Sequence, residues 1–202
     1  MSRLVDKSAQ QMRLSQAVWQ VLATQGLERL TIRAVAATAG CTTGLVMHRF
    51  PNRRALLMHA RQLLHERTRA RAESLEANSA TPQMALHAVL QQGLALNKET
   101  TAESTVWLGF LAAAVGDEEL TVLHRTNNHA WRRRVTRLVS AASPGWPDYQ
   151  TTTVALALVA LVEGTAALAS SDPAGYPPAT QEAMLDTALT ALGLTWSSGQ
   201  RE

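Results

Sequence analysis

The residues with the greatest capacity for chemistry lie close together between Thr31 and Arg54, in the stretch TIRAVAATAGCTTGLVMHRFPNRR. Its hydroxyl and imidazole groups can form hydrogen bonds with the edges of nucleic-acid bases, and its guanidinium groups can pair with phosphates. Proteins that recognise nucleic acid combine these two kinds of contact, because base contacts give specificity and phosphate contacts give position. Such side chains need a scaffold that presents them on one surface.

The same stretch predicts two short helices joined by a tight turn. Thr31 can cap a first helix, and Thr42 or Thr43 can cap a second helix that runs to about His48. Gly40, between them, permits the positive φ of a tight turn. The sequence therefore predicts a helix-turn-helix, whose second helix can enter the major groove of DNA.

Three residues at the spacing A-x3-G-x5-V support this prediction. The small Ala36 lets two helices cross closely, Gly40 forms the turn, and Val46 fills the angle between the helices. We expect base contacts from Thr42, Thr43, Gly44, Met47 and His48. We expect phosphate contacts from Thr31, Arg33, Arg49 and Arg53. The structural alternative is a tight helical corner that has no nucleic-acid partner.

Charge is distributed unevenly along the 202 residues. Residues 1–71 hold twelve Lys or Arg against three Asp or Glu, which leaves a net charge of +9. The remaining residues hold seven basic against thirteen acidic side chains, which leaves −6. A basic segment joined to an acidic body is typical of a module that binds a polyanion, although a merely solvated basic face is the simpler alternative.

Composition indicates an all-α chain. Hydrophobic residues make up 46% of the chain and aromatic residues only 4%, and Ala and Leu are the dominant apolar types. Between helix breakers, apolar residues recur three and four positions apart, as in Leu14, Val18, Val21 and Leu22. We therefore expect about nine helices and no sheet.

A reducing compartment and a position away from membranes are expected. Cys41 is the single cysteine, so the chain can form no internal disulfide, and we expect Cys41 to be a small buried hydrophobe rather than a redox sensor. Residues 1–14 contain no apolar run of signal-peptide length. The most apolar run, Val154 to Val162, is shorter than the roughly 20 residues of a membrane span. We predict a cytoplasmic protein in which this run is a core or interface helix.

Enzymatic and metal chemistry are not indicated. His65-Glu66 begins an H-E-x-x-H pattern, but Arg69 stands at the position of the second histidine. His124 and His129 are five residues apart, on different sides of a helix. The chain has no G-x-S-x-G, phosphate-binding glycine loop or dinucleotide fingerprint. We expect no catalytic residue, metal or cofactor.

A basic interaction module is the second functional alternative. Such an all-helical module would bind a membrane surface or an acidic protein, and would present a broad basic helix with exposed aromatic residues. In the basic part of this chain only Trp19 and Phe50 are aromatic, and the basic residues surround a compact pair of helices.

The segment from about Leu14 to Leu64 resembles the DNA-binding domain of the TetR family. The matching features are Gln25-Gly26, Thr31-Ile32-Arg33, Val35-Ala36, Ala39-Gly40, Gly44, and the run Phe50 to Leu57. Met47 stands where this family usually has a tyrosine that contacts the phosphate backbone. A thioether cannot donate that hydrogen bond, so we expect Arg49 to supply part of the contact.

Resemblance continues into the second part of the chain, which is similar to the BetI-like branch of the family. The similar segments are Val106 to Phe110, Leu120 to Arg137 with Trp131-Arg132-Arg133-Arg134, and Leu161 to Gly164. The resemblance implies a homodimeric regulator, most commonly a repressor, bound to a palindromic DNA operator. The resemblance also implies that a small organic ligand bound in the larger domain tilts the connecting helix and changes the separation of the two DNA-reading heads.

The implied organisation has two domains. Residues 1–50 form a three-helix DNA-binding domain, and residues 51–202 form a helical regulatory and dimerisation domain. Residues 51–73 form the connecting helix.

Two apolar segments near the C-terminus, Thr151 to Ala169 and Ala179 to Leu192, predict a four-helix bundle between two copies of the chain. Their apolar residues are too many for one short helix pair to bury. The predicted interface residues are Leu158, Leu161, Val162, Met184, Leu185, Ala188, Leu189 and Leu192. The alternative is that these residues form the core of a single chain.

Aromatic and polar residues of two successive helices predict a mostly apolar ligand pocket with a few polar groups. The predicted lining residues are Trp107, Phe110, His124, Asn127, Trp131 and Glu163. A buried carboxylate at Glu163 needs a partner, and a cationic ligand such as an amine, resting against a tryptophan, would provide one. The alternative is that the aromatic residues are core and Glu163 pairs with Arg132 or Arg134.

Overall fold

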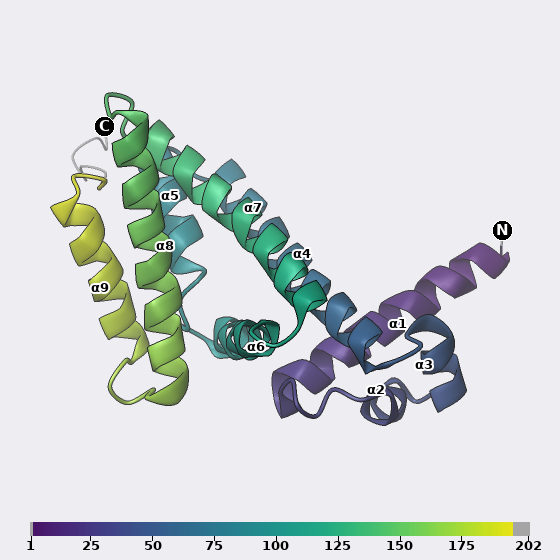
Figure 1. Cartoon of the computed structure of the whole chain (residues 1–202). Helices are drawn as coiled ribbons and strands as arrows, with labels where there is room; N and C mark the ends of the chain where they lie inside the picture. The colour runs from purple at the N-terminus through teal and green to yellow at the C-terminus, as the bar shows by residue number, and fades with distance from the viewer. Residues whose placement is uncertain (1, 196–202) are drawn as a thin grey trace. The chain divides into compact units, whose positions relative to one another are not determined.

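The described part of the chain is entirely helical outside its turns. The computed structural model describes residues 2–195, and no strand occurs among them. Within residues 2–195, nine helices follow one another in the order of the chain (Figure 1). They are α1 Ser2–Gln25, α2 Ile32–Ala39, α3 Thr43–Arg49, α4 Arg53–Ala77, α5 Pro82–Gln91, α6 Lys98–Ala114, α7 Glu118–Ala142, α8 Asp148–Ser171 and α9 Pro178–Ala191. The predictions of an all-α fold and of about nine helices are confirmed.

Two compact units divide the chain, and three helices pass from one unit to the other. The first unit comprises Met1–Arg67 and Thr105–His124, and the second comprises Thr68–Ser104 and Arg125–Glu202. α4, α6 and α7 each contribute residues to both units. Apolar residues of α6 and α7 belong to the core that α1–α4 build, and the expected domain boundary near residue 50 stays a prediction.

The first unit forms around the apolar stripe of α1. Leu14, Val18, Val21 and Leu22 recur at helical spacing and are at most 4% exposed. They belong to the same core as Phe110 of α6, which is 1% exposed. A Cβ atom on Gly109 would lie 3.4 Å from Leu27 Cβ, which shows how closely α6 approaches the turn after α1 in this unit.

The second unit is a bundle of α5, α8 and α9 with most of α7, and in it α8 and α9 lie side by side (Figure 1). Its core includes Leu86 and Leu90 of α5, Val135 of α7, and Leu158 of α8, all at most 1% exposed. The helices pack tightly at Gly93, where a Cβ atom would lie only 2.5 Å from Val162 Cγ1. A larger residue at position 93 would therefore push the chain away from α8.

α8 is long and apolar enough to cross a membrane when only length and composition are counted. In this unit, however, residues one helical turn apart are buried against the unit's own core, among them Ala155, Leu158 and Val162. α8 therefore has one face in the core of its own unit.

Candidate nucleic-acid interface

Local hydrogen bonds define the helix-turn-helix. Thr31 Oγ1 accepts a hydrogen bond from Ala34 N at 3.1 Å and caps α2. Thr42 Oγ1 accepts from Leu45 N at 3.3 Å, so Thr42 rather than Thr43 caps α3. Between the helices, Gly40 adopts φ 62° and ψ 42°, the left-handed conformation that glycine takes without strain. The predicted helix-turn-helix is confirmed.

The buried side of this pair of helices holds α3 in place. Val46 is fully buried and Ala36 is 3% exposed, as their spacing predicts. Burial of the valine side chain contributes roughly 1.5–3 kcal/mol to stability. Cys41 N also donates to Ala36 O at 3.0 Å, and the half-buried Cys41 packs against the core of the first unit. α3 therefore has one anchored face and one free face.

All nine predicted DNA-contact residues are exposed. They are Thr31, Arg33, Thr42, Thr43, Gly44, Met47, His48, Arg49 and Arg53. Met47 is 52% exposed, which is unusual for a large apolar side chain and leaves it available to contact apolar groups such as a thymine methyl. Their contacts with DNA remain predictions.

The arginines that flank α3 are held differently from one another. The guanidinium of Arg49 lies 5.6 Å from the ring centroid of Phe50, a cation–π contact that supports the side chain at the end of α3. Arg53 Nη2 donates to Leu27 O at 3.2 Å, which leaves further N–H groups for a phosphate. Asn52 Oδ1 accepts from Ala55 N at 2.9 Å and caps α4 directly beside Arg53.

Arg54 has a different environment from its neighbour Arg53. Its guanidinium pairs with Asp117 at 2.6 Å and with Glu119 at 3.1 Å. The pKa of the Asp117 carboxyl is lowered, mainly because Leu120 N–H donates to it and also because Arg54 lies beside it. Two carboxylates of the first unit thus balance the charge of Arg54, which was not among the predicted DNA contacts.

His59 of α4 lies behind the C-terminal end of α3, and the sequence did not single it out. Its Nε2 is 2.9 Å from Ser15 Oγ of α1, and its ring centroid is 4.9 Å from that of Phe50. Its pKa is lowered, first by burial and then by the positive charge of Arg49, while Glu66 acts in the opposite direction. A neutral imidazole therefore fits this position, which only the packing of α1, α3 and α4 reveals.

Three predicted ligand residues lie in the first unit, where Trp107 and His124 have ring centroids 6.2 Å apart. His124 is 9% exposed, and its pKa is lowered first by burial and then by the charge of Arg61. Phe110 is a core residue of this unit. For Phe110 the structure therefore agrees with the alternative that the aromatic residues are core.

The other three predicted ligand residues lie in the second unit. Asn127 is 5% exposed, and its amide nitrogen has no hydrogen-bond partner within the described chain. Trp131 packs against the core beside Gly93, and Glu163 is half-buried on α8. Arg134, one of the partners considered for Glu163, pairs with Glu73 and Glu76.

The predicted dimer-interface residues fall into two groups. Four are at most 1% exposed in the core of their own chain: they are Leu158, Val162, Leu185 and Leu189. Their place in a dimer interface stays a prediction. The other four are half-buried: they are Leu161, Met184, Ala188 and Leu192. Apolar spacing indicates that a helix face is buried, but it does not indicate whether the same chain or a second copy covers that face.

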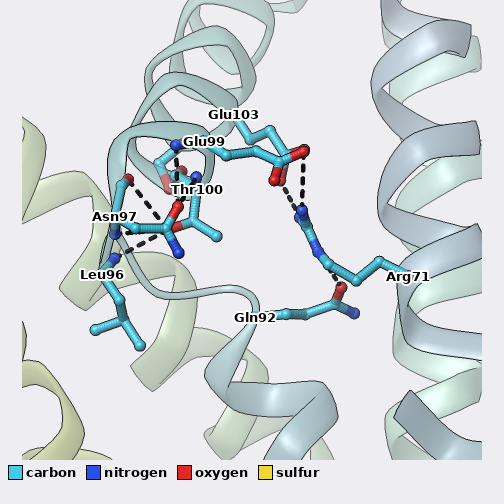
Figure 2. A network of polar contacts seen from close by, with 8 residues as sticks. Arg71, Gln92, Leu96, Asn97, Glu99, Thr100 and Glu103 are labelled. Atoms are coloured by element: carbon cyan, nitrogen blue, oxygen red, sulfur yellow. Dashed lines mark hydrogen bonds and ion pairs between the residues drawn. The ribbon is translucent and has the colours of Figure 1, made fainter. Parts of the chain in front are cut away.

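A polar network in the second unit also escaped the sequence analysis (Figure 2). Arg71 of α4 contacts Gln92 after α5, and Glu99 and Glu103 of α6. The available signal was the i,i+4 spacing of Glu99 and Glu103, which places two carboxylates on one face of a helix. The partner, 28 or more residues away along the chain, could not be inferred from spacing. No group of three His, Cys, Asp or Glu residues that could hold a metal occurs in residues 2–195.

The fold and the exposed α3 surface define a helix-turn-helix protein of the all-α class. Residues 15–60 match the family described as bacterial regulatory proteins, tetR family. Residues 82–194 match the family described as BetI-type transcriptional repressor, C-terminal. The chain belongs to the TetR family of transcriptional regulators and has a C-terminal region of the BetI type.

Individual proteins show the same relationship. The chain is 27% identical over 114 residues to the HTH-type transcriptional regulator PksA of Bacillus subtilis, and that alignment covers 56% of each chain, little more than half. It is 28% identical over 152 residues to BetI of Stenotrophomonas maltophilia, covering 75% of this chain and 76% of that one. A transcriptional regulator of Saccharomonospora viridis, solved in complex with choline, shares the fold at 17% identity with a TM-score of 0.82, covering 91% and 96% of the two chains.

Proposed function

We propose that this regulator is a homodimeric repressor that acts in the cytoplasm, binds a palindromic DNA operator and releases it when a small organic ligand binds. The observation that carries this proposal is the free face of α3, which presents Thr43 and His48 beside the exposed Arg33 and Arg53. α3 has only seven residues and can contact one short stretch of a major groove. Two copies of the chain, each bound to one half-site, would give a specificity for DNA sequence that a single copy of α3 does not provide.

We place the dimer interface on the exposed faces of α8 and α9 rather than on their buried faces. On α8, Leu156 and Leu168 are 44% and 46% exposed, and Ala160 and Gly164 lie exposed between them. On α9, Ala183 is also exposed. Small residues at this spacing let helices approach closely, and the exposed leucines supply apolar area. The half-buried Leu161, Met184, Ala188 and Leu192 border these faces.

We propose that the ligand is a small organic molecule, with an amine as the first class to test. In the second unit, Trp131 offers an aromatic face, Glu163 a carboxylate and Asn127 a buried amide nitrogen that has no hydrogen-bond partner. The choline complex of the Saccharomonospora protein supports testing quaternary amines first.

The DNA-binding proposal is tested by selecting genomic fragments on the purified protein and measuring gel shifts. We expect the enriched fragments to share a palindrome and to bind more tightly than random DNA of equal length. Equal binding to all fragments, together with binding to anionic lipid vesicles, would instead support the basic interaction module.

The ligand proposal is tested by tryptophan fluorescence during titration with choline and with neutral aromatic compounds, repeated with Glu163→Gln. We expect choline to bind the parent protein and to bind the variant more weakly, while neutral compounds do not distinguish the two. Equal amine binding by both proteins would remove Glu163 as the counter-ion.

A further inference from the structure

The C-terminal part of α4, from Thr68 to Ala77, is attached within the second unit largely by charged side chains. Ala72 is its one fully buried apolar residue in that unit's core, and Leu75 is partly buried. Two apolar side chains form a narrow contact for ten residues of helix. Ion pairs and hydrogen bonds of its charged side chains add contacts to other helices.

One group of contacts ties Arg71 to α5 and α6 (Figure 2). Arg71 Nε donates to Gln92 Oε1 at 3.0 Å, and its guanidinium pairs with Glu99 at 3.4 Å and, more closely, with Glu103. The side chains of Arg71 and Glu103 are 25% and 6% exposed, so this pair is shielded from solvent. A planar guanidinium that contacts three side chains has little freedom to turn.

A second group of contacts ties α4 to α7, with the charges reversed. Arg134 pairs with Glu73 at 3.2 Å and, more closely, with Glu76. Arg137 adds an ion pair to Glu76 at 2.5 Å. Arg134 and Glu76 are 17% and 18% exposed, which again places the pair largely out of solvent.

The signs of these charges specify one rotation and one register of α4. A helix turns by about 100° per residue, so Arg71 and Glu76 lie on opposite sides of the apolar strip of Ala72 and Leu75. Rotation of α4 in the sense that carries Arg71 across the apolar strip would move Arg71 toward the α7 side and Glu76 away from Arg134. Shielded charges without opposite partners are unfavourable, and polar pairs in such positions can select a register.

The partners of Arg71 are themselves held by the connector between α5 and α6, residues 92–97. A Cβ on Gly93 would lie 2.5 Å from Val162 of α8, so the connector packs tightly there. Ala95 donates through its N–H to Gln181 Oε1 at 2.9 Å and accepts from Gln181 Nε2 at 3.1 Å, which binds the connector to α9. At its end, Asn97 Oδ1 accepts from Thr100 N and caps α6 (Figure 2).

We propose that Arg71 is a positioning residue, through which the connector passes any displacement of α8 and α9 to α4. α4 follows α3 after only three residues, so a displacement of α4 would act close in sequence to the base-contacting helix. This inference rests on the proposed function, since it concerns how the regulatory region controls DNA binding. The ion pairs of Arg134 and Arg137 with α4 hold the opposite side of that helix. We therefore expect a displacement of the connector to rotate α4 rather than to detach it.

The experiment compares three variants with a matched control, Arg69→Gln. Arg69 pairs with Glu73 on its own helix at 2.9 Å, and both side chains are 50% exposed, so its loss removes an α4 charge without releasing α4 from another helix. The variants are Arg71→Gln, Arg71→Lys and the double variant Arg71→Gln/Glu103→Gln. Each protein carries Cys41→Ser and has spin labels on cysteines introduced at the exposed positions Ala37 and Ser140. Electron double resonance measures the distance between the two labels. The labelled chain is diluted with unlabelled chain, so that the measured distance is the one within a single chain.

We expect Arg71→Gln to shift or broaden this distance distribution relative to the control, and to weaken binding to the selected palindrome about tenfold or more. Affinity for random DNA should stay within about twofold, because the phosphate contacts are intact. Arg71→Lys keeps the charge but not the fork of donors, so it should change the distribution in the same direction by less. The double variant also removes the Glu103 carboxylate, which Arg71→Gln leaves without its guanidinium partner. Its melting temperature should therefore return toward that of the parent protein, while its label-to-label distance distribution should stay that of Arg71→Gln.

Recovery of both the distance distribution and the palindrome affinity by the double variant would overturn the inference, because Arg71 would then act only on stability. If Arg71→Gln fails to fold, the lysine and double variants decide the question. Failure of the parent protein to bind any palindrome would refute the proposed function. The intramolecular distance needs neither DNA nor a dimer, so it would still show whether Arg71 positions α4.

Discussion

Arg53 and Arg54 are adjacent in the sequence, and we predict opposite roles for them in DNA binding. Arg53 is exposed beside the N-terminus of α4 and makes one hydrogen bond, to Leu27 O at 3.2 Å. Arg54 is engaged by Asp117 at 2.6 Å and Glu119 at 3.1 Å. Arg53→Ala should therefore lose a phosphate contact, whereas Arg54→Ala should not.

The magnitude follows from counterion release. The slope of log K against log salt concentration is about −0.9 for each phosphate contact on duplex DNA. A dimer loses two such contacts in Arg53→Ala, so the slope should become less steep by about 1.8. Between about 50 and 200 mM salt, the parent should lose roughly tenfold more affinity than this variant.

The assay is fluorescence anisotropy with the selected palindrome and with random DNA at several salt concentrations. Arg53→Ala should weaken binding to both DNAs and reduce both slopes, and Arg53→Lys should restore the slope because it restores the charge. Arg54→Ala is the matched control and should keep the parent slope. Equal slopes for Arg53→Ala and the parent would show that Arg53 does not lie near a phosphate.

Three further predictions concern base reading, assembly and pH. Thr43→Ala and His48→Ala should each relax preference at one or two base pairs per half-site, by roughly 1–3 kcal/mol for each lost contact; unchanged preferences in a sequence-selection experiment would contradict the assignment of groove residues. Leu156→Arg should give folded monomers by light scattering and circular dichroism, because this side chain is 44% exposed in the chain, and a variant that stays dimeric would exclude this face. The pKa of His59 is lowered by burial and by Arg49, so its neutral form stabilises the fold above its ordinary pKa and this contribution disappears as pH falls through the lowered value. Urea unfolding from pH 7.5 to 5 should therefore show a smaller loss of stability in His59→Gln than in the parent, and parallel losses would contradict this role.

Apolar spacing in the sequence does not distinguish a dimer face from the core of a single chain. Leu158 and Leu189 have the helical spacing of an interface, but they are 1% exposed in the core of their own chain. Burial in a chain's own core and burial against a second copy leave the same apolar pattern in a sequence. The exposed residues between them, such as Ala160 and Gly164, carry too little hydrophobic signal to be noticed without the structure.

The sequence by itself determined the helix-turn-helix, because its caps and turn act over three or four residues. The Thr31 and Thr42 hydroxyls bond N–H groups three positions away, and Gly40 adopts the left-handed conformation that its own chemistry permits. Val46 is buried, as its position relative to Ala36 and Gly40 predicts.

Only the tertiary structure decided which charges are free and which are paired. Arg54 meets Asp117 across 63 positions, and Arg71 meets Glu103 across 32. Electrostatic pairing depends on distance in space, and identical side chains in one stretch of sequence therefore acquire different functions once the helices pack. The same reason explains why Arg53 could be proposed for DNA from the sequence, while the part of Arg71 in positioning α4 became visible only in the fold.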